Sequence, residues 1–379
     1  FMLWLESSGK LDRDIEFLPK KDELLERFSG GGNPWTRPEL AVLICYSKVM
    51  LKESLLEADL LNDAWLADSV EKAFPRMLIE YLGGTVSSHQ LANEIAATQL
   101  ANDLVDRFGF TFLFFAVESV GSSPRDIVRA LTVVINVLGI DQLWHLIETD
   151  DGDFSAEMQL DLFHILIKLV RRSTIWFLRH RSPGFDCAES IGLFAEPMQQ
   201  LLENWVKLQP NSWQVKLFCE TSKGEVAANS ISGMQRLSDN LFSALGIIDL
   251  ALRDNWPVNK IASIYTIVGE TLMLDDLMSK ITGIKSVGRW QDLARESSMN
   301  QLEQYHRDTT ALLLQIWEGK PEEMAELWQV AQEATIASWG VMMSEIRKSG
   351  GNDYALMTVA LNEFLNLVEG LRRISRERN

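Results

Sequence analysis

The chain has 379 residues, of which 53 are acidic and 36 basic, giving a formal net charge of −17 with histidine neutral. Hydrophobic residues make up 46% and charged residues 23%, which are ordinary values for a globular protein and exclude wholesale disorder. The length suffices for about two or three domains. The acidic balance argues against a nucleic-acid partner, because phosphate contacts need a basic face.

The cysteines and the apolar runs bear on the cellular compartment. Cys45, Cys187 and Cys219 are widely spaced and form no CxxC pair, which predicts reduced residues of a cytoplasmic protein. No apolar run reaches the roughly 18 residues that span a bilayer, so we expect no membrane partner. The first residues lack the basic region of a signal peptide, and a start at Phe1 rather than methionine favours a segment of a longer polypeptide.

Helical periodicity and cap signals run through most of the chain. Thr36 and Glu39 have the spacing of a capping box, which predicts a long helix from that point, with leucines at intervals of three and four. Ser123 and Pro124 open a second helix that Gly139 ends. Further helices are expected at Leu91 to Phe108, Ser155 to Arg181, Glu196 to Leu208, Leu241 to Asn255 and Val258 to Leu274.

The last third of the chain contains three long helical segments, expected at Arg289 to Glu318, Glu322 to Lys348 and Asp353 to Arg376. Their short connections favour antiparallel neighbours and predict an up-down bundle. Alternating strand patterns are missing from the sequence. We therefore predict an all-α fold, a multi-helix array that ends in this bundle.

Two stretches interrupt the helical pattern and suggest domain boundaries. Three glycines before Pro34 favour a flexible connection, and small polar residues dilute the pattern from Pro210 to Ser238. These features divide the chain into a junction segment, 1–35, an N-terminal helical subdomain, 36–209, and a C-terminal helical subdomain, 210–379.

The sequence offers no catalytic, cofactor-binding or metal-binding residue that a motif supports. The five histidines are never three or four positions apart, so no helix presents a metal pair. The triple glycine lacks the spacing of a dinucleotide-binding turn, and a GxSxG elbow is missing. A triad assembled from distant residues remains open, since its members need not be close in sequence.

Two groups of residues suggest contacts of another kind. Cations near the end of one expected helix, Arg171, Arg179 and Arg181, complement the helix dipole or bind an anion. The small polar residues Thr98, Asn102 and Asp103 share one helix stripe beside alanines. That stripe is consistent with a buried hydrogen-bond seam within a domain and, equally, with a docking face between domains.

Several motifs resemble the C-terminal region of the large bacterial NAD-dependent glutamate dehydrogenases. The two most specific are TRPELAVLICYSKV, Thr36 to Val49, and EIAATQLANDLVDRFG, Glu94 to Gly109. LESSGKLDRDIEFLP, Leu5 to Pro19, is similar to the junction that follows the catalytic domain of that family. Weaker matches follow in the family's order, namely SPRDIVRA, WFLRHR, GETLMLDDL, RWQDLAR and DYALMTVALNEF.

The resemblance implies a helical, non-catalytic domain of an enzyme that oxidatively deaminates L-glutamate to 2-oxoglutarate and ammonia while reducing NAD. The family's cofactor turn and catalytic residues match no position here, so this chain alone is expected not to catalyse the reaction. The implied partners are the catalytic domain of the same polypeptide and further copies of it in a homo-oligomer. Thr36, Arg37 and Glu39, within the first motif, are candidates for the inter-domain contact, together with Thr98, Asn102 and Asp103.

The role of such a domain has two main alternatives. The first is assembly, in which the domain docks on the catalytic core. The second is regulation, in which a helical pocket binds a small anionic effector through Arg171, Arg179 and Arg181. An unrelated helical interaction protein, or a hydrolase with a dispersed triad, is a more distant interpretation.

Overall fold

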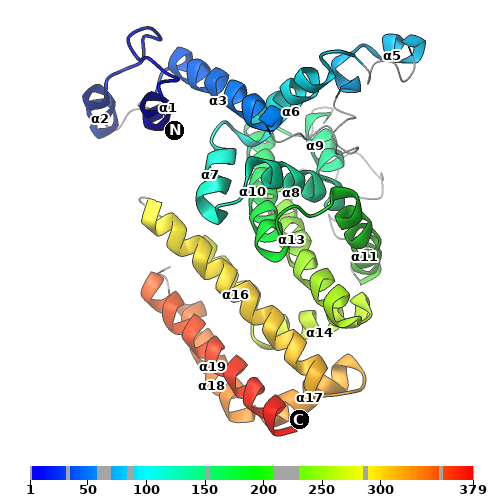
Figure 1. Ribbon diagram of the computed structural model, residues 1–379. Helices are drawn as coiled ribbons and strands as arrows, with labels where there is room; N and C mark the ends of the chain where they lie inside the picture. Colours follow the sequence, from blue (N-terminus) through cyan, green and yellow to red (C-terminus); the bar gives the residue numbers. More distant parts are fainter. Residues whose placement is uncertain are drawn as a thin grey trace. The chain divides into compact units, whose positions relative to one another are not determined.

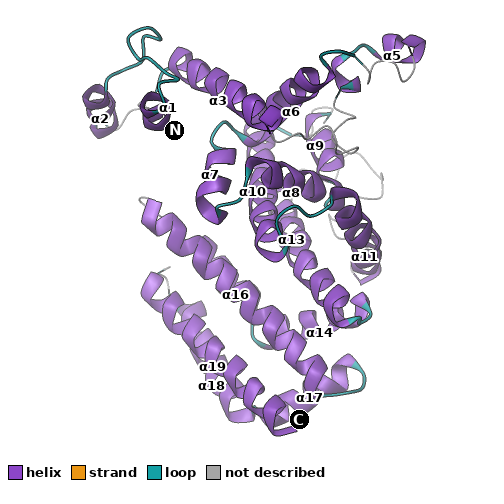
Figure 2. Ribbon diagram, viewed as in Figure 1, coloured by secondary structure: helices purple, strands orange, loops and turns teal. Residues whose placement is uncertain are grey.

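The computed structural model describes residues 2–30, 35–57, 70–82, 89–149, 154–208, 230–284, 289–349 and 353–378. All regular secondary structure within these ranges is helical (Figure 2), which confirms the predicted all-α fold. The chain forms two compact units, Phe1–Gly192 with Ser222–Ser238 and Leu193–Thr221 with Asp239–Asn379. The predicted linker residues 31–34 and the predicted boundary at 209/210 lie outside the described residues.

Unit 1 contains the helices of the first half of the chain. Its α3 packs most extensively against α6, and α8 packs against α10. Figure 1 labels the α-helices of this unit. The bounds are α1 Met2–Ser7, α2 Lys21–Ser29, α3 Arg37–Glu57, α5 Arg76–Leu82, α6 Ala92–Phe108, α7 Phe112–Val120, α8 Pro124–Val137, α9 Ile140–Glu148 and α10 Ala156–His180, with a short 3₁₀ helix, η2, at Glu71–Ala73.

The helix starts of unit 1 follow the cap signals of the sequence. The Ser123 hydroxyl accepts a hydrogen bond from the Asp126 backbone N–H at 3.1 Å, with Pro124 in the first turn of α8. The Ser155 hydroxyl caps α10 in the same way. Gly139, with φ of 63°, separates α8 from α9. The predicted helix starts at Ser123 and Ser155 and the stop at Gly139 are confirmed. Caps of this kind favour a helix start because the side chain supplies a partner for backbone N–H groups that the helix leaves free.

The segment before α3 packs as part of unit 1. Leu5, Leu11 and Leu18 are at most 6% exposed and share one hydrophobic cluster with Leu43 and Met50 of α3. Burial of such side chains stabilises the packed segment by about 1.5–3 kcal/mol each. Residues 2–18 are therefore attached to α3 by a continuous apolar contact.

Unit 2 contains the C-terminal helices α14 Val258–Thr271, α15 Leu274–Thr282, α16 Arg289–Ile316, α17 Pro321–Ala331, α18 Glu333–Lys348 and α19 Tyr354–Arg378. Helices α16 and α19 lie side by side (Figure 1). The Tyr354 hydroxyl donates to the Gln291 carbonyl at one end, and the Arg378 guanidinium donates to the Ile316 carbonyl at the other. These helices are parallel, and α17 with α18 forms the returning leg of the predicted up-down arrangement.

The prediction of one helix from Glu322 to Lys348 is wrong, because the helix breaks at Gln332. Its side chain accepts from the Trp328 indole N–H at 2.9 Å and donates to the Leu367 carbonyl of α19 at 3.1 Å. The buried amide therefore has partners on both sides, and unpaired polar groups are costly in such surroundings. A contact with α19 sets this break, which neither glycine nor proline marks.

The expected helix from Val258 to Leu274 also ends early. Met273 has a φ of 52°, in the left-handed region, and separates α14 from α15. The break leaves the Leu272 carbonyl available, and the Trp339 indole N–H donates to it at 2.8 Å. Pairing of this buried carbonyl stabilises a turn that non-glycine residues rarely adopt.

Two helices start earlier than predicted and contribute residues to both units. Helix α11 is Cys187–Leu208 rather than Glu196 to Leu208, with Pro197 in its interior. Its start follows Asp186, whose side chain accepts from the Glu189 N–H at 2.7 Å. Helix α13 is Ser230–Asp254, so the last part of the predicted irregular stretch, up to Ser238, is helical.

The length and hydropathy of the described helices bear on whether any of them could cross a membrane. Among the described residues, no single helix is both long and apolar enough to cross a bilayer, and α8 with α9 passes that test only as a pair bent by 69°.

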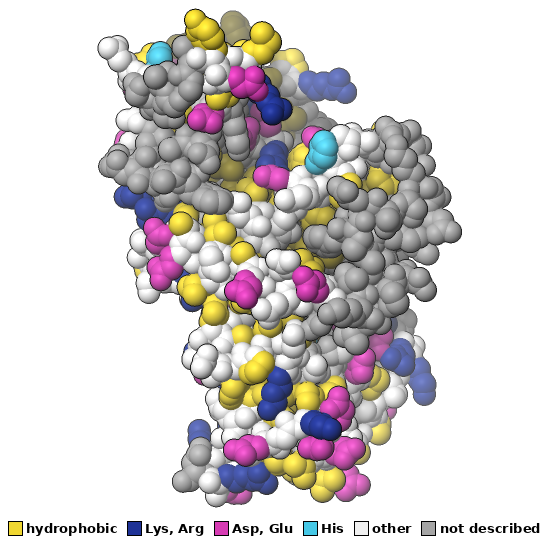
Figure 3. Space-filling model, turned by 90° about the vertical axis from the view of Figure 1, so that its right-hand side faces the viewer, with side chains coloured by type: hydrophobic (Ala, Val, Ile, Leu, Met, Phe, Trp, Pro, Cys, Tyr) yellow, Lys and Arg dark blue, Asp and Glu magenta, His cyan; other side chains and the backbone are white. Residues whose placement is uncertain are grey.

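On the face in Figure 3, lysine and arginine side chains are interspersed with aspartate and glutamate. This mixture limits the local potential that the net charge creates.

Candidate functional site

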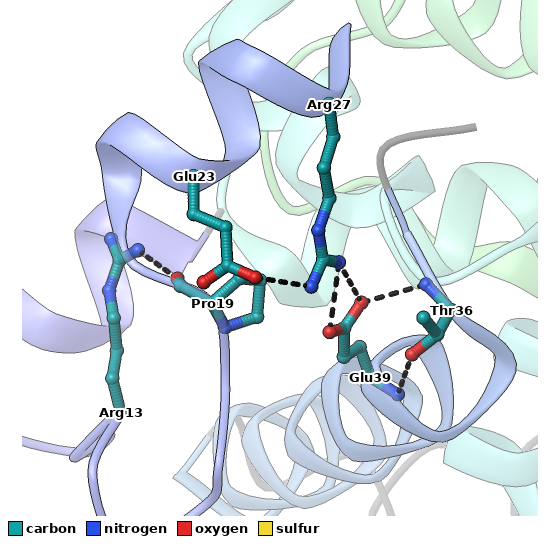
Figure 4. A network of polar contacts seen from close by, with 6 residues as sticks. All are labelled: Arg13, Pro19, Glu23, Arg27, Thr36 and Glu39. Atoms are coloured by element: carbon teal, nitrogen blue, oxygen red, sulfur yellow. Dashed lines mark hydrogen bonds and ion pairs between the residues drawn. The ribbon is translucent and has the colours of Figure 1, made fainter. Parts of the chain in front are cut away.

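The predicted capping box is formed at the start of α3. The Thr36 backbone N–H donates to a Glu39 carboxylate oxygen at 2.7 Å, and the Glu39 N–H donates to the Thr36 hydroxyl at 3.4 Å (Figure 4). Burial raises the pKa of the Glu39 carboxyl, but hydrogen bonds from Thr36 and Arg27 lower it by more, so the pKa lies below its ordinary value. Glu39 is therefore a carboxylate that both of its neighbours stabilise.

The same carboxylate joins α2 to α3. Arg27 of α2 donates to both Glu39 oxygens at 3.0 Å and to Glu23 at 2.6 Å (Figure 4). Nearer the N-terminus, Arg13 donates to the Pro19 carbonyl at 2.8 Å and pairs with Glu6. One Arg27 nitrogen serves both Glu39 oxygens and the other serves Glu23, and hydrogen bonds between charged groups are stronger than neutral ones. The network thus holds the segment before α3 in a defined position.

Thr36→Ala is expected to lower the free energy of unfolding by about 1 kcal/mol, the typical cost of a lost N-cap hydroxyl. Urea unfolding of both proteins measures the difference. The matched control is Thr358→Ala, whose exposed hydroxyl bonds only the Tyr354 carbonyl within α19. We expect this control to stay within about 0.5 kcal/mol of wild type. Equal stabilities for Thr36→Ala and wild type would show that the box contributes nothing.

Of the candidate inter-domain residues, the structure brings Thr36 and Glu39 together, while Arg37 is exposed in the first turn of α3. Thr98, Asn102 and Asp103 are all half-buried on α6. The Thr98 hydroxyl donates to the Glu94 carbonyl of its own helix at 2.6 Å. The docking role of this stripe stays a prediction.

The alanines beside that stripe face the protein interior. Ala97 and Ala101 are at most 5% exposed, and α6 packs closely on α3. Lys48 of α3 pairs with Asp106 of α6 at 2.7 Å. Small side chains at this contact let the two helices approach closely, which accounts for the alanines through packing within unit 1.

The three arginines of the candidate anion site have different surroundings. Arg171 donates to the Phe108 carbonyl at the end of α6, at 2.8 Å, and its guanidinium lies 5.8 Å from the Phe112 ring centre. Arg181 lies over the Phe177 ring, and Arg179 is exposed. Arg171 and Arg179 are eight positions apart on α10, about 12 Å along the axis.

A small cavity lies near Arg171, between α3, α6, α7 and α8. It has a volume of about 10 Å³, which is room for one water molecule. Its lining includes Ser47, whose hydroxyl donates to the Phe110 carbonyl at 2.8 Å, and is otherwise largely apolar. A small organic effector needs a pocket of about 300 Å³ or more, so this cavity is a packing void.

Unit 2 contains a polar cluster that sequence analysis missed, in which Tyr265 and His306 are buried and Ser243 and Glu303 half-buried. The Tyr265 hydroxyl donates to Glu303 at 2.8 Å, and the Ser243 hydroxyl donates to the same carboxylate at 3.3 Å. The His306 ring stacks on Tyr265 and bonds the Tyr265 carbonyl through Nε2 at 2.7 Å. These residues come from α13, α14 and α16, and the hydrogen-bonded pair Ser243 and Glu303 is 60 positions apart.

Burial shifts the pKa values of this cluster. Desolvation, followed by the charge of Glu303, raises the pKa of the Tyr265 hydroxyl well above its ordinary value. Desolvation lowers the pKa of His306 to about 3, so the ring is neutral at physiological pH. A neutral ring that bonds a carbonyl carries its proton on Nε2. In the sequence, the glycine at position 269 is a signal of this contact, because a Cβ there would lie 3.2 Å from the His306 ring.

Together these observations define an all-helical module in which polar networks join neighbouring helices. No group of three or more histidine, cysteine or acidic side chains gathers as a metal site in the described part of the chain. Residues 32–366 match the family model described as "Glutamate dehydrogenase, C-terminal". The chain belongs to this family, and the resemblance predicted from the sequence motifs is confirmed.

Curated relatives are NAD-specific glutamate dehydrogenases of much greater length. The chain is 35% identical over 376 residues to the protein of Pseudomonas aeruginosa, covering 96% of this chain and 23% of that protein. It is 32% identical over 378 residues to the protein of Halomonas elongata, covering 97% of this chain and 23% of that protein. It is 28% identical over 371 residues to the protein of Mycobacterium tuberculosis, covering 95% of this chain and 22% of that protein. The chain thus spans less than a quarter of the length of these relatives.

Proposed function

We propose that the chain is the C-terminal region of an NAD-specific glutamate dehydrogenase and serves assembly by docking on the catalytic region of the same polypeptide. The parent enzyme would convert L-glutamate and NAD to 2-oxoglutarate, ammonia and NADH, within a cytoplasmic homo-oligomer. NAD would bind the parent outside this chain. The observation that carries the proposal is the match to a C-terminal family over most of the chain, combined with coverage of 23% of enzymes with that activity.

The contacts of the candidate anion residues support assembly over regulation. Arg171 bonds the carbonyl that ends α6, where a cation complements the helix dipole. Arg181 lies over the Phe177 ring, a cation–π contact that stabilises local packing. Both side chains thus have roles within unit 1 that need no effector.

Deletion of residues 1–379 from the longer polypeptide is expected to change its subunit association and to leave its response to effectors unchanged. Sedimentation analysis of both proteins measures the association, and steady-state kinetics with and without effectors measures the response. The control carries Thr358→Ala in the intact polypeptide, at an exposed position. An unchanged oligomer with a lost effector response would overturn the assembly proposal in favour of regulation.

Anions are expected not to stabilise this chain. An anion that bound the arginine cluster would raise the free energy of unfolding by about 2.7 kcal/mol at a hundredfold excess over Kd. Thermal shift with citrate and nucleotides compares wild type with the double variant Arg179→Ala, Arg181→Ala, and we expect no shift in either. A saturable shift in wild type that the double variant loses would favour the regulatory alternative.

A further inference from the structure

The turn between α1 and α2 carries two exposed apolar side chains. Ile15 is 71% exposed and Phe17 is 90% exposed, while their neighbour Leu18 is 6% exposed. Burial of an aromatic side chain as large as phenylalanine is favourable, since it removes apolar area from water. Residues 12–18, here called the apolar turn, leave that gain unrealised at two nearby positions.

The apolar turn is held rigidly. Leu11, directly before the turn, and Leu18, at its end, are buried in the cluster with α3. An Asp12 carboxylate oxygen accepts from the Asp14 N–H at 2.9 Å, and the Leu18 N–H donates to the Arg13 carbonyl at 2.9 Å. Glu16, between the two exposed residues, accepts from the Tyr46 hydroxyl of α3 at 2.7 Å. A turn fixed at both ends and in its middle presents Ile15 and Phe17 in one orientation.

The backbone at Phe17 is strained in this arrangement. Its φ is 52°, in the left-handed region where a Cβ lies too close to the following carbonyl oxygen. Bulky residues adopt this conformation where surrounding contacts enforce it, and such positions are concentrated at functional sites. The burial of Leu18 and the Glu16–Tyr46 bond enforce it here.

The length of the relatives indicates which part of the polypeptide contacts the apolar turn. The family match begins at residue 32, so the turn precedes the region that defines the C-terminal family. More than three quarters of each matched dehydrogenase lies outside the aligned region. Exposed apolar residues within a polar rim have the anatomy of a small interface core, and Asp12, Asp14 and Lys20 are exposed around them in sequence.

We propose that Ile15 and Phe17 insert into an apolar socket on the same polypeptide, outside residues 1–379. The inference rests on the proposed function, since it names the surface through which this region docks. The fixed turn positions the two side chains before contact, which reduces the ordering cost of docking.

Photocrosslinking in the full-length polypeptide tests this contact. Phe17 is replaced by a benzophenone analogue of phenylalanine, and the same analogue replaces Trp290, 82% exposed on α16, in a second protein. After irradiation we expect loss of the unmodified peptide that contains position 17, and a new adduct with a peptide outside residues 1–379. The adduct should migrate at the mass of one polypeptide.

Each other result overturns the proposal in a distinct way. An adduct of twice the mass would identify a second copy as the occupant. An adduct within residues 1–379, or none, from position 17 would show that the turn does not dock. If position 290 alone reaches peptides outside residues 1–379, the docking function stands without this turn. If neither position does and the deletion leaves association unchanged, both proposals fail.

Discussion

Phe364→Ala is expected to lower the free energy of unfolding of unit 2 by about 3–5 kcal/mol. Phe364 is fully buried on α19. Its ring centre lies 5.5 Å from that of Trp339 on α18 and 5.7 Å from that of Tyr305 on α16. Truncation removes the apolar area and leaves a cavity where three helices meet. Urea unfolding followed by tryptophan fluorescence measures the loss.

The matched control for this variant is Val359→Ala on the same helix. Val359 is 54% exposed, so its truncation is expected to stay within about 0.5 kcal/mol of wild type. Because the chain forms two compact units, the unfolding transition of each needs separate fitting. A loss below about 1 kcal/mol for Phe364→Ala would mean that α19 is not packed against α16 and α18 as described.

Local signals predicted much of the fold. The starts of α3, α8 and α10 follow Thr36, Ser123 and Ser155, because an N-cap acts on amides two or three positions away and is visible in a short window. The long C-terminal helices follow from apolar periodicity in the same way. What depends on a few neighbouring residues could be predicted from the sequence.

The helix breaks at Met273 and Gln332 depend on distant residues. Gln332 bonds the Leu367 carbonyl, 35 positions away, and Trp339 bonds the Leu272 carbonyl, 67 positions away. A buried partner of this kind offsets the cost of interrupting a helix. Neither break carries a glycine or proline, so sequence patterns treated both stretches as continuous helix.

In the candidate sites too, contacts between neighbouring residues could be predicted from the sequence and contacts between distant residues could not. Thr36 and Glu39 were predicted to interact and do, since both belong to one helical turn. The arginines were grouped by closeness in sequence, but Arg171 is directed to the end of α6. His306 and Tyr265 are 41 positions apart, so their contact depends on the packing of α14 against α16. Motif searches that rely on spacing have no access to such a pair.

Unit 2 is expected to lose stability as the pH falls below about 6.5, because His306 must remain neutral in the folded state. Its pKa is about 3 when folded and about 6.5 when unfolded. Between these values the unfolded chain binds more protons, so acid favours unfolding. The contribution is fully present above pH 6.5 and is lost towards pH 3. At pH 5 the loss amounts to about 2 kcal/mol.

Urea unfolding at pH 7.5, 6.0 and 5.0 measures this dependence, and His306→Gln identifies its source. A glutamine amide still has an N–H to donate to the Tyr265 carbonyl but does not titrate, so the variant should lose most of the decline between pH 6.5 and 5. His145→Gln, at an exposed position on α9, is the matched control and should keep the wild-type slope. Equal slopes in wild type and His306→Gln would show that His306 is not buried as a neutral ring between α14 and α16.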